Sequence, residues 1–350
     1  MMNQKINIKS LSLNDLSEKL KEFGMEGYRA TQVKQWLYQK QAASFAEMTN
    51  IAKECRVILE ENFEIKRLPV VTSQLSEDGT RKYLLGLEDG KNIECVFIPA
   101  EGRNTLCVSS QVGCAMDCDF CLTATMGLFR NLSIYEIVDQ VGAVIRDMKE
   151  RGDDRRLSNL VFMGMGEPLA NHKNLYAALE ILLDQLCYNF SRNHITVSTS
   201  GLAPEIEKFG DKTGVKLAIS LNATTDEVRD GIMPINKKYP LERLFEACRK
   251  MHLPNRNKIT FEYVMLHGVN DTMEDAKRLI KILSTLKAKV NLIPFNEFSG
   301  SKYKRPPDEW VYSFQKILLD KGFIAVVRRS RGRDILGACG QLANASVKAA

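Results

Sequence analysis

The stretch "TLCVSSQVGCAMDCDFC", Thr105 to Cys121, joins a short strand pattern to a loop with three closely spaced cysteines. Cys114, Cys118 and Cys121 follow C-x3-C-x2-C spacing, and Cys107 lies just upstream. A structural zinc site has four Cys or His ligands, and no fourth ligand follows at knuckle spacing. Ferredoxin runs use a different spacing and a fourth cysteine. We therefore expect three thiolates to leave one iron of a [4Fe–4S] cluster open to a substrate or cosubstrate.

The chain around this loop alternates between strand and helix patterns from about residue 103. Strands are expected at "TLCVSS", "NLVFMG", "ITVSTS", "VKLAISL", "ITFEYVML", "KVNLIPF" and "FIAVVRRS". The helices expected between them include "SIYEIVDQVGAVIRDM", "NLYAALEILLDQL", "PLERLFEACRKM" and "MEDAKRLIKILSTL". The first of these begins with a capping box formed by Ser133 and Glu136. Six βα units predict a parallel sheet covered by helices, either an incomplete barrel or a doubly wound sheet. In both architectures reactive groups collect where the strands end, and the cysteine loop follows the first strand.

Two shorter segments precede this repeat. Residues 1–65 predict a small helical domain, with helices at "LNDLSEKLKEFG" and "YRATQVKQWLYQK" and with Trp36 in its core. Residues 66–100 contain short β-type runs divided by the turn sequences "SEDG" and "EDGK". This pattern predicts a small antiparallel meander.

Composition and cysteine usage restrict the class of protein. The 350 residues are 44% hydrophobic and 26% charged, which is ordinary for a globular protein. No segment approaches the roughly 18–20 apolar residues of a membrane span, and the start lacks the apolar region of a signal peptide. Nine cysteines without a secretory signal predict a reducing compartment and thiols that bind metal or react. We therefore expect a cytoplasmic protein.

Basic residues gather in one segment near the end of the chain. The net charge is +6, and an equal excess falls within residues 301–333. The basic residues there are Lys302, Lys304, Arg305, Lys316, Lys321, Arg328, Arg329, Arg331 and Arg333. Charge alone leaves two interpretations open, a solvated basic surface and a nucleic-acid face.

Polar groups follow several of the expected strands. "FMGMGEPLAN" follows the second strand, "STSG" from Ser198 the third, "SLNA" from Ser220 the fourth, and "PFNE" with Asn296 the sixth. One such group alone could be a turn, but together they predict the lining of a cofactor site. Near the end, Cys339 lies in "RDILGACGQL" between two glycines, which predicts a loop with close backbone approach.

These features resemble the RlmN/Cfr family of radical S-adenosylmethionine RNA methyltransferases. The cysteine loop, with Phe120 before its third cysteine, is similar to that of the radical S-adenosylmethionine superfamily. The narrower family is indicated by "YRATQVKQWLY", "RNLSIYEIVDQV", "FMGMGEPLAN", "MPINKKYP", "VMLHGVND", "NLIPFN" and "ACGQL", which together span nearly the whole chain. The resemblance implies an α/β fold with a partial (βα)6 barrel core at 101–345. A β-meander linker at 66–100 and an N-terminal helical, RNA-binding accessory domain at 1–65 would precede it.

The resemblance also implies a mechanism. Cys114, Cys118 and Cys121 would hold one [4Fe–4S] cluster per chain, and two S-adenosylmethionine molecules would be used per turnover. Cys339 would take a methyl group from the first molecule, and a 5′-deoxyadenosyl radical from the second would remove a hydrogen from that methyl. The methylene radical would then add to an adenine carbon. Cys107 would resolve the protein–RNA adduct by attacking Cys339, and the resulting disulfide would explain a need for reductant in every turnover.

Further residues are matched to family positions. Glu94, in "NIECVFIP", matches a proton acceptor. The matches to cofactor-contacting positions are Gly166, Glu167, Ser198, Ser220, Leu221, Asn222 and Asn296. Many relatives carry His at the position of Asn222, so the resemblance supports a backbone contact there. Cys55, Cys95, Cys187 and Cys248 match no family position and are interpreted as packing residues.

The implied reaction is methylation at C2 of an adenosine in the peptidyl transferase centre of 23S rRNA, and at C2 of the adenosine next to the anticodon in some tRNAs. The "GEPL" stretch favours the RlmN branch, because Cfr proteins typically have Ala at the position of Pro168. Methylation at C8 of the same adenosine is an alternative, and a non-catalytic iron–sulfur RNA-binding or sensor protein is a second. The implied partners are 23S rRNA, tRNA and a low-potential electron donor such as flavodoxin or ferredoxin. We expect a monomer without membrane contact, whose basic segment binds phosphates.

Overall fold

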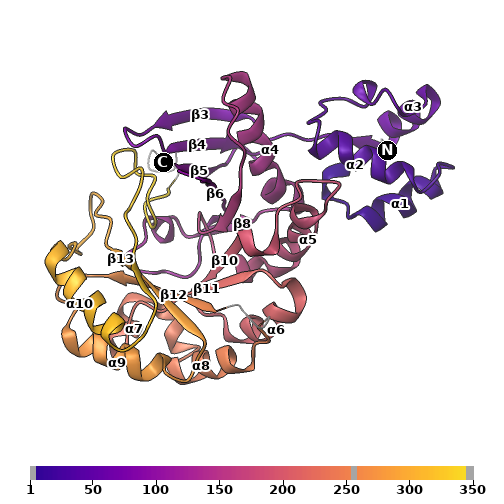
Figure 1. Ribbon diagram of the computed structural model, residues 1–350. Coiled ribbons are helices and arrows are strands. Elements are labelled where there is room, and N and C mark those ends of the chain that lie inside the picture. Colours follow the sequence, from indigo (N-terminus) through magenta and orange to yellow (C-terminus); the bar gives the residue numbers. More distant parts are fainter. Residues whose placement is uncertain (1–4, 254–257, 344–350) are drawn as a thin grey trace.

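The computed structural model describes residues 5–253 and 258–343. Its centre is one ten-stranded sheet, in which seven parallel strands pair in the order of the sequence (Figure 1). They are β6 (Arg103–Cys107), β9 (Asn159–Phe162), β10 (Ile195–Thr199), β11 (Lys216–Ser220), β12 (Ile259–Met265), β13 (Ala288–Pro294) and β14 (Ala325–Val327). A doubly wound sheet reverses its strand order at a switch point, and this order does not reverse. The predicted α/β fold with a partial (βα)6 barrel is therefore confirmed.

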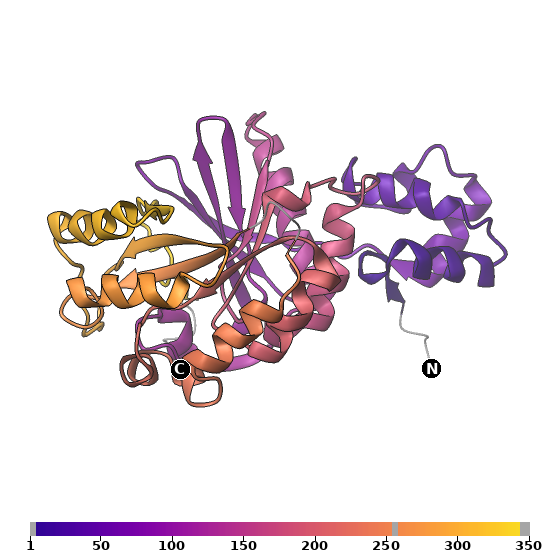
Figure 2. The ribbon, with the colours of Figure 1, turned by 60° about the horizontal axis from the view of Figure 1, so that its bottom comes forward.

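Helices follow the parallel strands and cover the outer face of the curved sheet (Figures 1 and 2). They are α4 (Ile134–Glu150), α5 (His172–Leu183), α6 (Ala203–Thr213), α7 (Asp226–Ile232), α8 (Leu241–Lys250), α9 (Met273–Leu283) and α10 (Asp308–Asp320). The predicted capping box begins α4, where Glu136 Oε2 accepts from the backbone nitrogen of Ser133 at 2.8 Å. Among the helices of the described residues, none has the length and apolar character needed to cross a membrane.

The meander is an edge of the same sheet. Strands β3 (Val70–Leu75), β4 (Arg81–Gly86) and β5 (Asn92–Ala100) pair antiparallel, and β5 pairs antiparallel with β6. Val96 lies opposite Cys107 across that last pair. The predicted boundary between residues 100 and 101 thus falls inside a hairpin of one sheet, and the division into three domains stays a prediction. The pairing brings the segment with Glu94 beside the first barrel strand.

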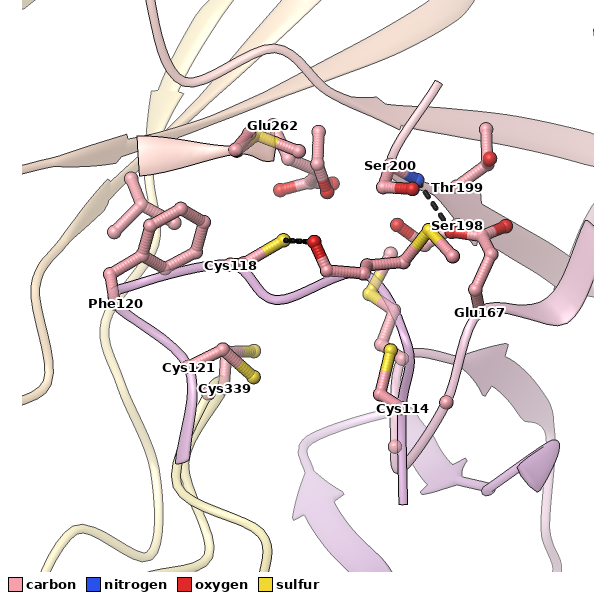
Figure 3. A pocket seen from close by; sticks show the side chains of 18 of the residues that line it. Cys114, Cys118, Phe120, Cys121, Glu167, Ser198, Thr199, Ser200, Glu262 and Cys339 are labelled. Atoms are coloured by element: carbon pink, nitrogen blue, oxygen red, sulfur yellow. Dashed lines mark hydrogen bonds between the residues drawn. The ribbon is translucent and has the colours of Figure 1, made fainter. Parts of the chain in front are cut away.

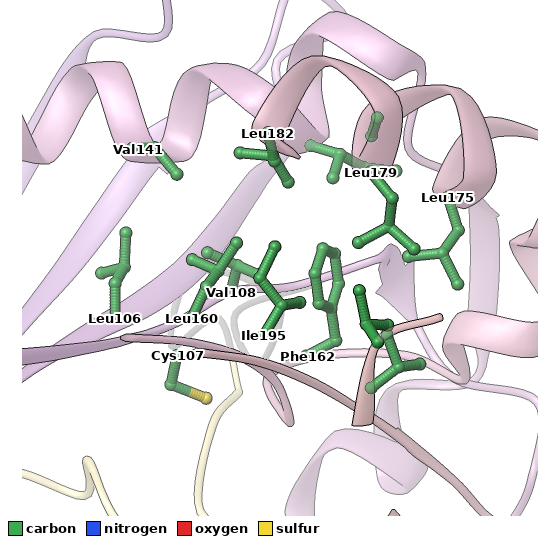
Figure 4. Packing of buried hydrophobic residues seen from close by; sticks show 14 of the residues in the cluster. Leu106, Cys107, Val108, Val141, Leu160, Phe162, Leu175, Leu179, Leu182 and Ile195 are labelled. Atoms are coloured by element: carbon green, nitrogen blue, oxygen red, sulfur yellow. The ribbon is translucent and has the colours of Figure 1, made fainter. Parts of the chain in front are cut away.

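Successive side chains along β6 and just beyond it point alternately to the hydrophobic core and to the interior of the barrel. Leu106 and Val108 are buried against side chains of the covering helices, among them Val141, Leu179 and Leu182 (Figure 4). The Cys107 side chain lies on the opposite face of the strand, away from these core residues. Because successive strand side chains point to opposite faces, this pattern directs Cys107 to the interior of the barrel.

The N-terminal helical unit consists of α1 (Leu13–Glu22), α2 (Arg29–Tyr38) and α3 (Lys53–Asn62), with a short parallel pair of β1 (Ile6–Asn7) and β2 (Phe63–Glu64). It projects from one side of the barrel (Figure 2). Val33 and Leu37 are fully buried, but the prediction of Trp36 in the core is wrong, because this side chain is only partly buried. Its indole nitrogen donates to Asn50 at 2.6 Å, and the Lys40 ammonium lies 3.7 Å from the ring centroid. The polar indole edge places Trp36 at the boundary of the core.

A buried cluster of charges joins this unit to the barrel. Asp139 on α4 is fully buried and accepts from Lys9 Nζ at 2.6 Å and from Arg146 Nη2 at 3.0 Å. Its second oxygen also accepts from the backbone nitrogen of Leu68 at 2.6 Å. Burial alone would raise the pKa of the Asp139 carboxyl, but Lys9 and Arg146 hold it below its ordinary value. Asp139 is therefore the anchor through which the N-terminal unit is held on α4.

We predict that Asp139→Asn lowers the free energy of unfolding by about 3–5 kcal/mol, because the substitution leaves the buried Lys9 ammonium without its counter-charge. Urea unfolding followed by circular dichroism measures this change. The matched control is Asp320→Asn, which removes the partner of Lys316 in an exposed pair on α10 and should leave stability close to wild type. Equal effects of the two substitutions would contradict the anchoring role of Asp139.

Candidate active site

A cavity opens at the carboxyl ends of the parallel strands (Figure 3). It is lined by the cysteine loop, by the ends of β9 to β13 and by the segment that carries Cys339. The predicted site residues on its wall are Cys114, Cys118, Cys121, Gly166, Glu167, Ser198, Ser220, Asn296 and Cys339. The structure thus brings together residues from six separate segments. Cys107, Glu94, Leu221 and Asn222 lie outside this lining.

The cysteine loop is held at both ends. Gly113, at the end of β7 (Gln111–Gly113), has a φ of +77°, and a Cβ there would overlap the Gly127 carbonyl oxygen. The backbone nitrogen of Cys114 donates to that same oxygen at 2.8 Å. Gly127 leads into β8 (Leu128–Asn131), which pairs antiparallel with β7. Farther along the loop, the Asp119 carboxylate accepts from the Tyr303 hydroxyl at 2.7 Å. These contacts keep the three thiols on the cavity wall.

The three thiols are ligands of the type that hold an iron–sulfur cluster. Within residues 5–253 and 258–343, no three Cys, His, Asp or Glu side chains are arranged as ligands of one metal ion. Each iron of a [4Fe–4S] cluster takes its own thiolate, so three separated sulfurs on one wall fit that group. Burial raises the pKa of Cys114 to about 12 and also raises the pKa of Cys118 and Cys121. Cluster binding would have to displace these protons, as thiolate ligation does generally.

The Glu167 carboxylate accepts hydrogen bonds that connect the turn after β9 with the turn after β10. Its Oε1 accepts from the backbone nitrogen of Leu169 at 3.0 Å and its Oε2 from that of Ser200 at 2.7 Å. The preceding Gly166 has a φ of +95°, and a Cβ there would overlap the side chain of Gln111. Gln111 Oε1 in turn accepts from the Glu167 backbone nitrogen at 2.7 Å. The "GMGEP" stretch therefore packs directly on the strand that leads into the cysteine loop.

Arg229 on α7 organises the next two strand ends from behind. Its guanidinium is fully buried and donates to the carbonyl oxygens of Ser200 at 2.7 Å, Leu221 at 3.0 Å and Ser220 at 3.1 Å. A further bond reaches Asn236 Oδ1 at 2.9 Å. Burial lowers the pKa of Arg229 to about 10, which leaves it charged at neutral pH. One side chain therefore sets the geometry of two turns that line the cavity.

Leu221 and Asn222 form the turn behind the cavity. Asn222 has a φ of +58°, its Oδ1 accepts from the Val264 backbone nitrogen at 2.8 Å, and its carbonyl accepts from Asn270 Nδ2 at 2.7 Å. Leu221 is fully buried. Both residues support the Ser220 turn through protein contacts, and a cofactor contact from either one stays a prediction.

The segment with Cys339 packs on the cysteine loop. Leu122 donates its backbone N–H to the Gly340 carbonyl at 2.8 Å, and Thr123 Oγ1 donates to the Leu342 carbonyl at 2.5 Å. Asn296 Nδ2 donates to the carbonyl of Cys339 itself at 3.1 Å. The exposed Cys339 side chain opens onto the cavity, and desolvation by the cavity walls raises the pKa of its thiol.

Cys107 and Cys339 lie within electrostatic range of each other although more than two hundred residues separate them in the sequence. Burial raises the pKa of the Cys107 thiol, and the charge of Cys339 raises it further. Both cysteines are free thiols in this structure. The barrel interior thus holds a second thiol close to the one that faces the cavity.

Glu94 lies in an adjacent cavity between the meander and the terminal segment, which Lys82, Leu122 and Gln341 also line. Its Oε1 is 3.3 Å from Lys82 Nζ, and its Oε2 accepts from the Ala343 backbone nitrogen at 3.0 Å. Burial raises the pKa of the Glu94 carboxyl, and Lys82 opposes this shift. The carboxylate is therefore a buried, cation-paired base on the other side of the segment that bears Cys339.

Sequence comparisons place this geometry in a family. A sequence model of the radical SAM superfamily matches residues 108–280, and one of the ribosomal RNA large subunit methyltransferase N-terminal domain matches residues 6–65. The dual-specificity RNA methyltransferase RlmN of Geobacter sulfurreducens is 55% identical over 97% of this chain and 93% of its own length. That of Pelobacter propionicus is 53% identical over 97% and 96%. The chain belongs to the RlmN family of radical S-adenosylmethionine RNA methyltransferases.

A solved structure of the same class agrees with this membership. A radical SAM methyltransferase from Sphaerobacter thermophilus superposes with a TM-score of 0.90 at 41% identity, over 96% of this chain and 99% of its own. RlmN-family membership implies a [4Fe–4S] cluster and S-adenosylmethionine. The three cavity thiols could hold the cluster, and the polar strand ends could hold the cosubstrate.

Three polar residues at this RlmN-family site do not appear among the sequence predictions. Arg229 gives no local signal, because its partners are backbone carbonyls far along the chain. Ser200 lies within the "STSG" motif and lines the cavity. Glu262 also lines the cavity, and its signal is a lone acid inside the apolar strand "ITFEYVM".

We predict that Arg229→Lys weakens binding of S-adenosylhomocysteine at least tenfold and lowers the free energy of unfolding by about 2–4 kcal/mol. A single ammonium cannot replace the fork of donors, so buried carbonyls lose their partners. Equilibrium dialysis and urea unfolding measure the two effects. Arg243→Lys, in a half-exposed ion pair between α8 and Glu207, is the matched control and should leave both quantities close to wild type. Unchanged binding in Arg229→Lys would show that Arg229 does not organise the site.

Proposed function

We propose that this protein methylates C2 of an adenosine in the peptidyl transferase centre of 23S rRNA, and C2 of the adenosine next to the anticodon in some tRNAs. The observation that carries the proposal is that Cys339 opens onto the same cavity as the three cluster-type thiols. The family supports RNA as the substrate, and the name of its members as dual-specificity enzymes supports two kinds of RNA.

The role proposed for Cys339 follows from the reactivity of the target. An aromatic C–H carbon is a poor nucleophile, so a polar methyl transfer to it is unfavourable. Cys339 Sγ therefore first takes the methyl group of one S-adenosylmethionine and releases S-adenosylhomocysteine, since sulfur is the strongest nucleophile available. When bound, the cluster supplies the electron that cleaves a second S-adenosylmethionine to a 5′-deoxyadenosyl radical. The S-methyl group of Cys339 loses a hydrogen atom to this radical, and its carbon then bonds to adenine C2. The adduct radical formed in this way gives up one electron, which the cluster could accept when bound.

The roles proposed for Glu94 and Cys107 concern release of the product. Glu94 accepts the proton that leaves adenine C2, and its pairing with Lys82 supports an ionised carboxylate for that task. Cys107 sulfur then attacks Cys339 sulfur, which breaks the bond from Cys339 to the transferred carbon and forms a disulfide. The proton given up by the Cys107 thiol balances the proton that the released carbon takes up to become a methyl group. Two electrons from a reductant restore both thiols. The proximity of Cys107 to Cys339 supports this pairing. One cluster per chain and two S-adenosylmethionine molecules per turnover complete the proposal.

Only part of the basic segment at residues 301–333 is proposed to contact RNA. Four of its residues, Lys302, Lys304, Arg305 and Lys316, pair with carboxylates. Arg329, Arg331 and Arg333 are exposed and directly precede the segment with Cys339. Within the described residues no ion pair engages these three arginines, and only Arg331 donates to a backbone carbonyl, that of Asp78 at 3.2 Å, which supports a role in binding phosphates. A monomer that takes electrons from flavodoxin or ferredoxin remains our expectation.

One experiment separates this function from the two alternatives. The cluster is reconstituted anaerobically, reductant, S-adenosylmethionine and a 23S rRNA fragment are added, and digested nucleosides are analysed by mass spectrometry. We expect 2-methyladenosine together with 5′-deoxyadenosine. 8-Methyladenosine would instead support the Cfr-type reaction. Absence of 5′-deoxyadenosine from enzyme with an intact cluster would support the sensor alternative.

The cysteine roles give a prediction on covalent intermediates. Cys107→Ala should accumulate a covalent protein–RNA adduct, because the thiol that releases the product is missing. Cys339→Ala should form neither adduct nor methylated RNA. Denaturing gels with labelled RNA detect the adduct, and Cys248→Ala, on the outer helix α8, serves as the control with wild-type behaviour. Methylation by Cys339→Ala would refute the covalent route.

The pairing of Glu94 predicts a pH effect. Lys82 lowers the pKa of Glu94 against the effect of burial, so Lys82→Met should raise that pKa further. A base with a raised pKa stays protonated to higher pH, and the acidic limb of the single-turnover rate should move toward alkaline pH. Lys66→Met, which breaks a surface pair with Glu88, is the control for loss of a lysine charge. Coincident acidic limbs for Lys82→Met and wild type would exclude Glu94 as the base that Lys82 controls.

A further inference from the structure

Glu262 is a buried acid on the cavity wall that the mechanism above does not use. It lies on β12, is 7% exposed, and lines the same cavity as the cluster thiols (Figure 3). Its Oε1 accepts from Asn291 Nδ2 at 2.8 Å. In residues 5–253 and 258–343 no ion pair engages its carboxylate. A buried carboxylate with one neutral donor is costly, so this arrangement points to a ligand that supplies further donors.

Two other residues on the cavity wall have buried polar atoms without hydrogen-bond partners. Ser200 Oγ and Asn296 Oδ1 are buried and have no hydrogen-bond partner within the described part of the chain. Both line the cavity together with Glu262. Asn296 Nδ2 donates to the Cys339 carbonyl, so the amide is oriented with its oxygen as an acceptor. The wall therefore presents mainly unsatisfied acceptors, and its ligand must carry hydroxyl or amino donors on the facing side.

The strand register places Glu262 beside Ser220, a residue already matched to a cosubstrate-contacting position. It lies opposite Ser220 of β11 on one side and Asn291 of β13 on the other. Val264, two residues nearer the mouth on the same face, also lines the cavity. A ligand that reaches from the cluster thiols across the ends of β11 and β13 must pass over Glu262. Burial raises the pKa of the Glu262 carboxyl, and Arg328 and Asn291 partly oppose this shift.

We propose that Glu262 binds the vicinal diol of a ribose held in this cavity, and that the ribose is that of S-adenosylmethionine. A carboxylate can accept from two adjacent hydroxyls at once, and acidic side chains recognise ribose hydroxyls in this way in dinucleotide-binding folds. Ser200 and Asn296 bind the same nucleoside. The inference rests on the proposed function only through the identity of the cosubstrate. A substrate adenosine also carries a ribose, so the test must separate the two sources.

The test measures binding without RNA and without turnover. Reconstituted holoenzyme is dialysed to equilibrium with S-adenosylhomocysteine and with its 2′-deoxy and 3′-deoxy analogues. Wild type should bind the diol about ten- to a hundredfold more tightly than either analogue, as expected for a charge-assisted hydrogen bond. Glu262→Gln should weaken binding of the diol and reduce this preference to a few-fold. Glu262→Asp keeps the charge but shortens the reach, and should lose most of the preference as well.

Controls separate a local effect from a general one. Glu136→Gln alters another buried glutamate, which lies on α4 and is bound to Arg130 of β8, and should keep the wild-type preference. Iron content and the electron paramagnetic resonance spectrum of the reduced cluster should be the same in all variants. Wild-type preference in both Glu262 variants would overturn the inference.

The two sources of ribose give different results. If Glu262→Gln leaves the binding of S-adenosylhomocysteine and its analogues unchanged but weakens binding of the RNA fragment, the diol belongs to the substrate and the inference is overturned. Failure of the proposed function would look different. An enzyme that prefers the diol through Glu262, but forms no 2-methyladenosine, would refute the proposed reaction and leave the ribose contact in place.

Discussion

The parallel pairing of seven strands in sequence order is the constraint on which the rest of the structure depends. Since each strand runs in the same direction as its neighbours, all their carboxyl ends open at one edge of the sheet. The cysteine loop after β6, the Gly166–Glu167 turn after β9 and the serine turns after β10 and β11 therefore meet at one cavity. Helices packed on the outer face leave the inward-facing side chains free to build a polar site, with Cys107 and Glu262 among them.

A second level of organisation comes from segments outside the barrel repeat. The antiparallel pairing of β5 with β6 brings Glu94 beside the barrel. The terminal segment closes over the site and contacts each functional part, with Gly340 on Leu122 of the cysteine loop and Ala343 on Glu94. Cys339 therefore has the cluster thiols on one side and the buried carboxylate on the other. The position of Cys339 depends on all of these contacts, and the residues next to it in the sequence do not determine it alone.

Much of the fold and part of the site could be predicted from local sequence. Alternating strand and helix patterns indicated every parallel strand, and Ser133 with Glu136 marked the start of α4, because both are properties of a few adjacent residues. The partly buried Trp36 was misjudged because helical periodicity shows which face is apolar but not where a polar indole edge meets solvent. Arg229 was missed since its partners are backbone carbonyls of two distant turns. The contacts of Asn222 with Val264 and Asn270 could not be predicted, because these partners lie on a later strand and loop, and its cofactor contact stays a prediction.

By itself the sequence determined the cysteine spacing, the βα repeat and the family, because thiolate ligation and hydrophobic periodicity depend on short separations along the chain. The strand and helix patterns left an incomplete barrel and a doubly wound sheet open, and the pairing in the tertiary structure decided between them, since strand order depends on contacts between distant segments. It also decided which polar groups remain without partners. Whether Glu262, Ser200 and Asn296 are satisfied depends on every neighbour that surrounds them. Only the folded chain could show that the unpaired polar atoms of these residues lie on the cavity wall.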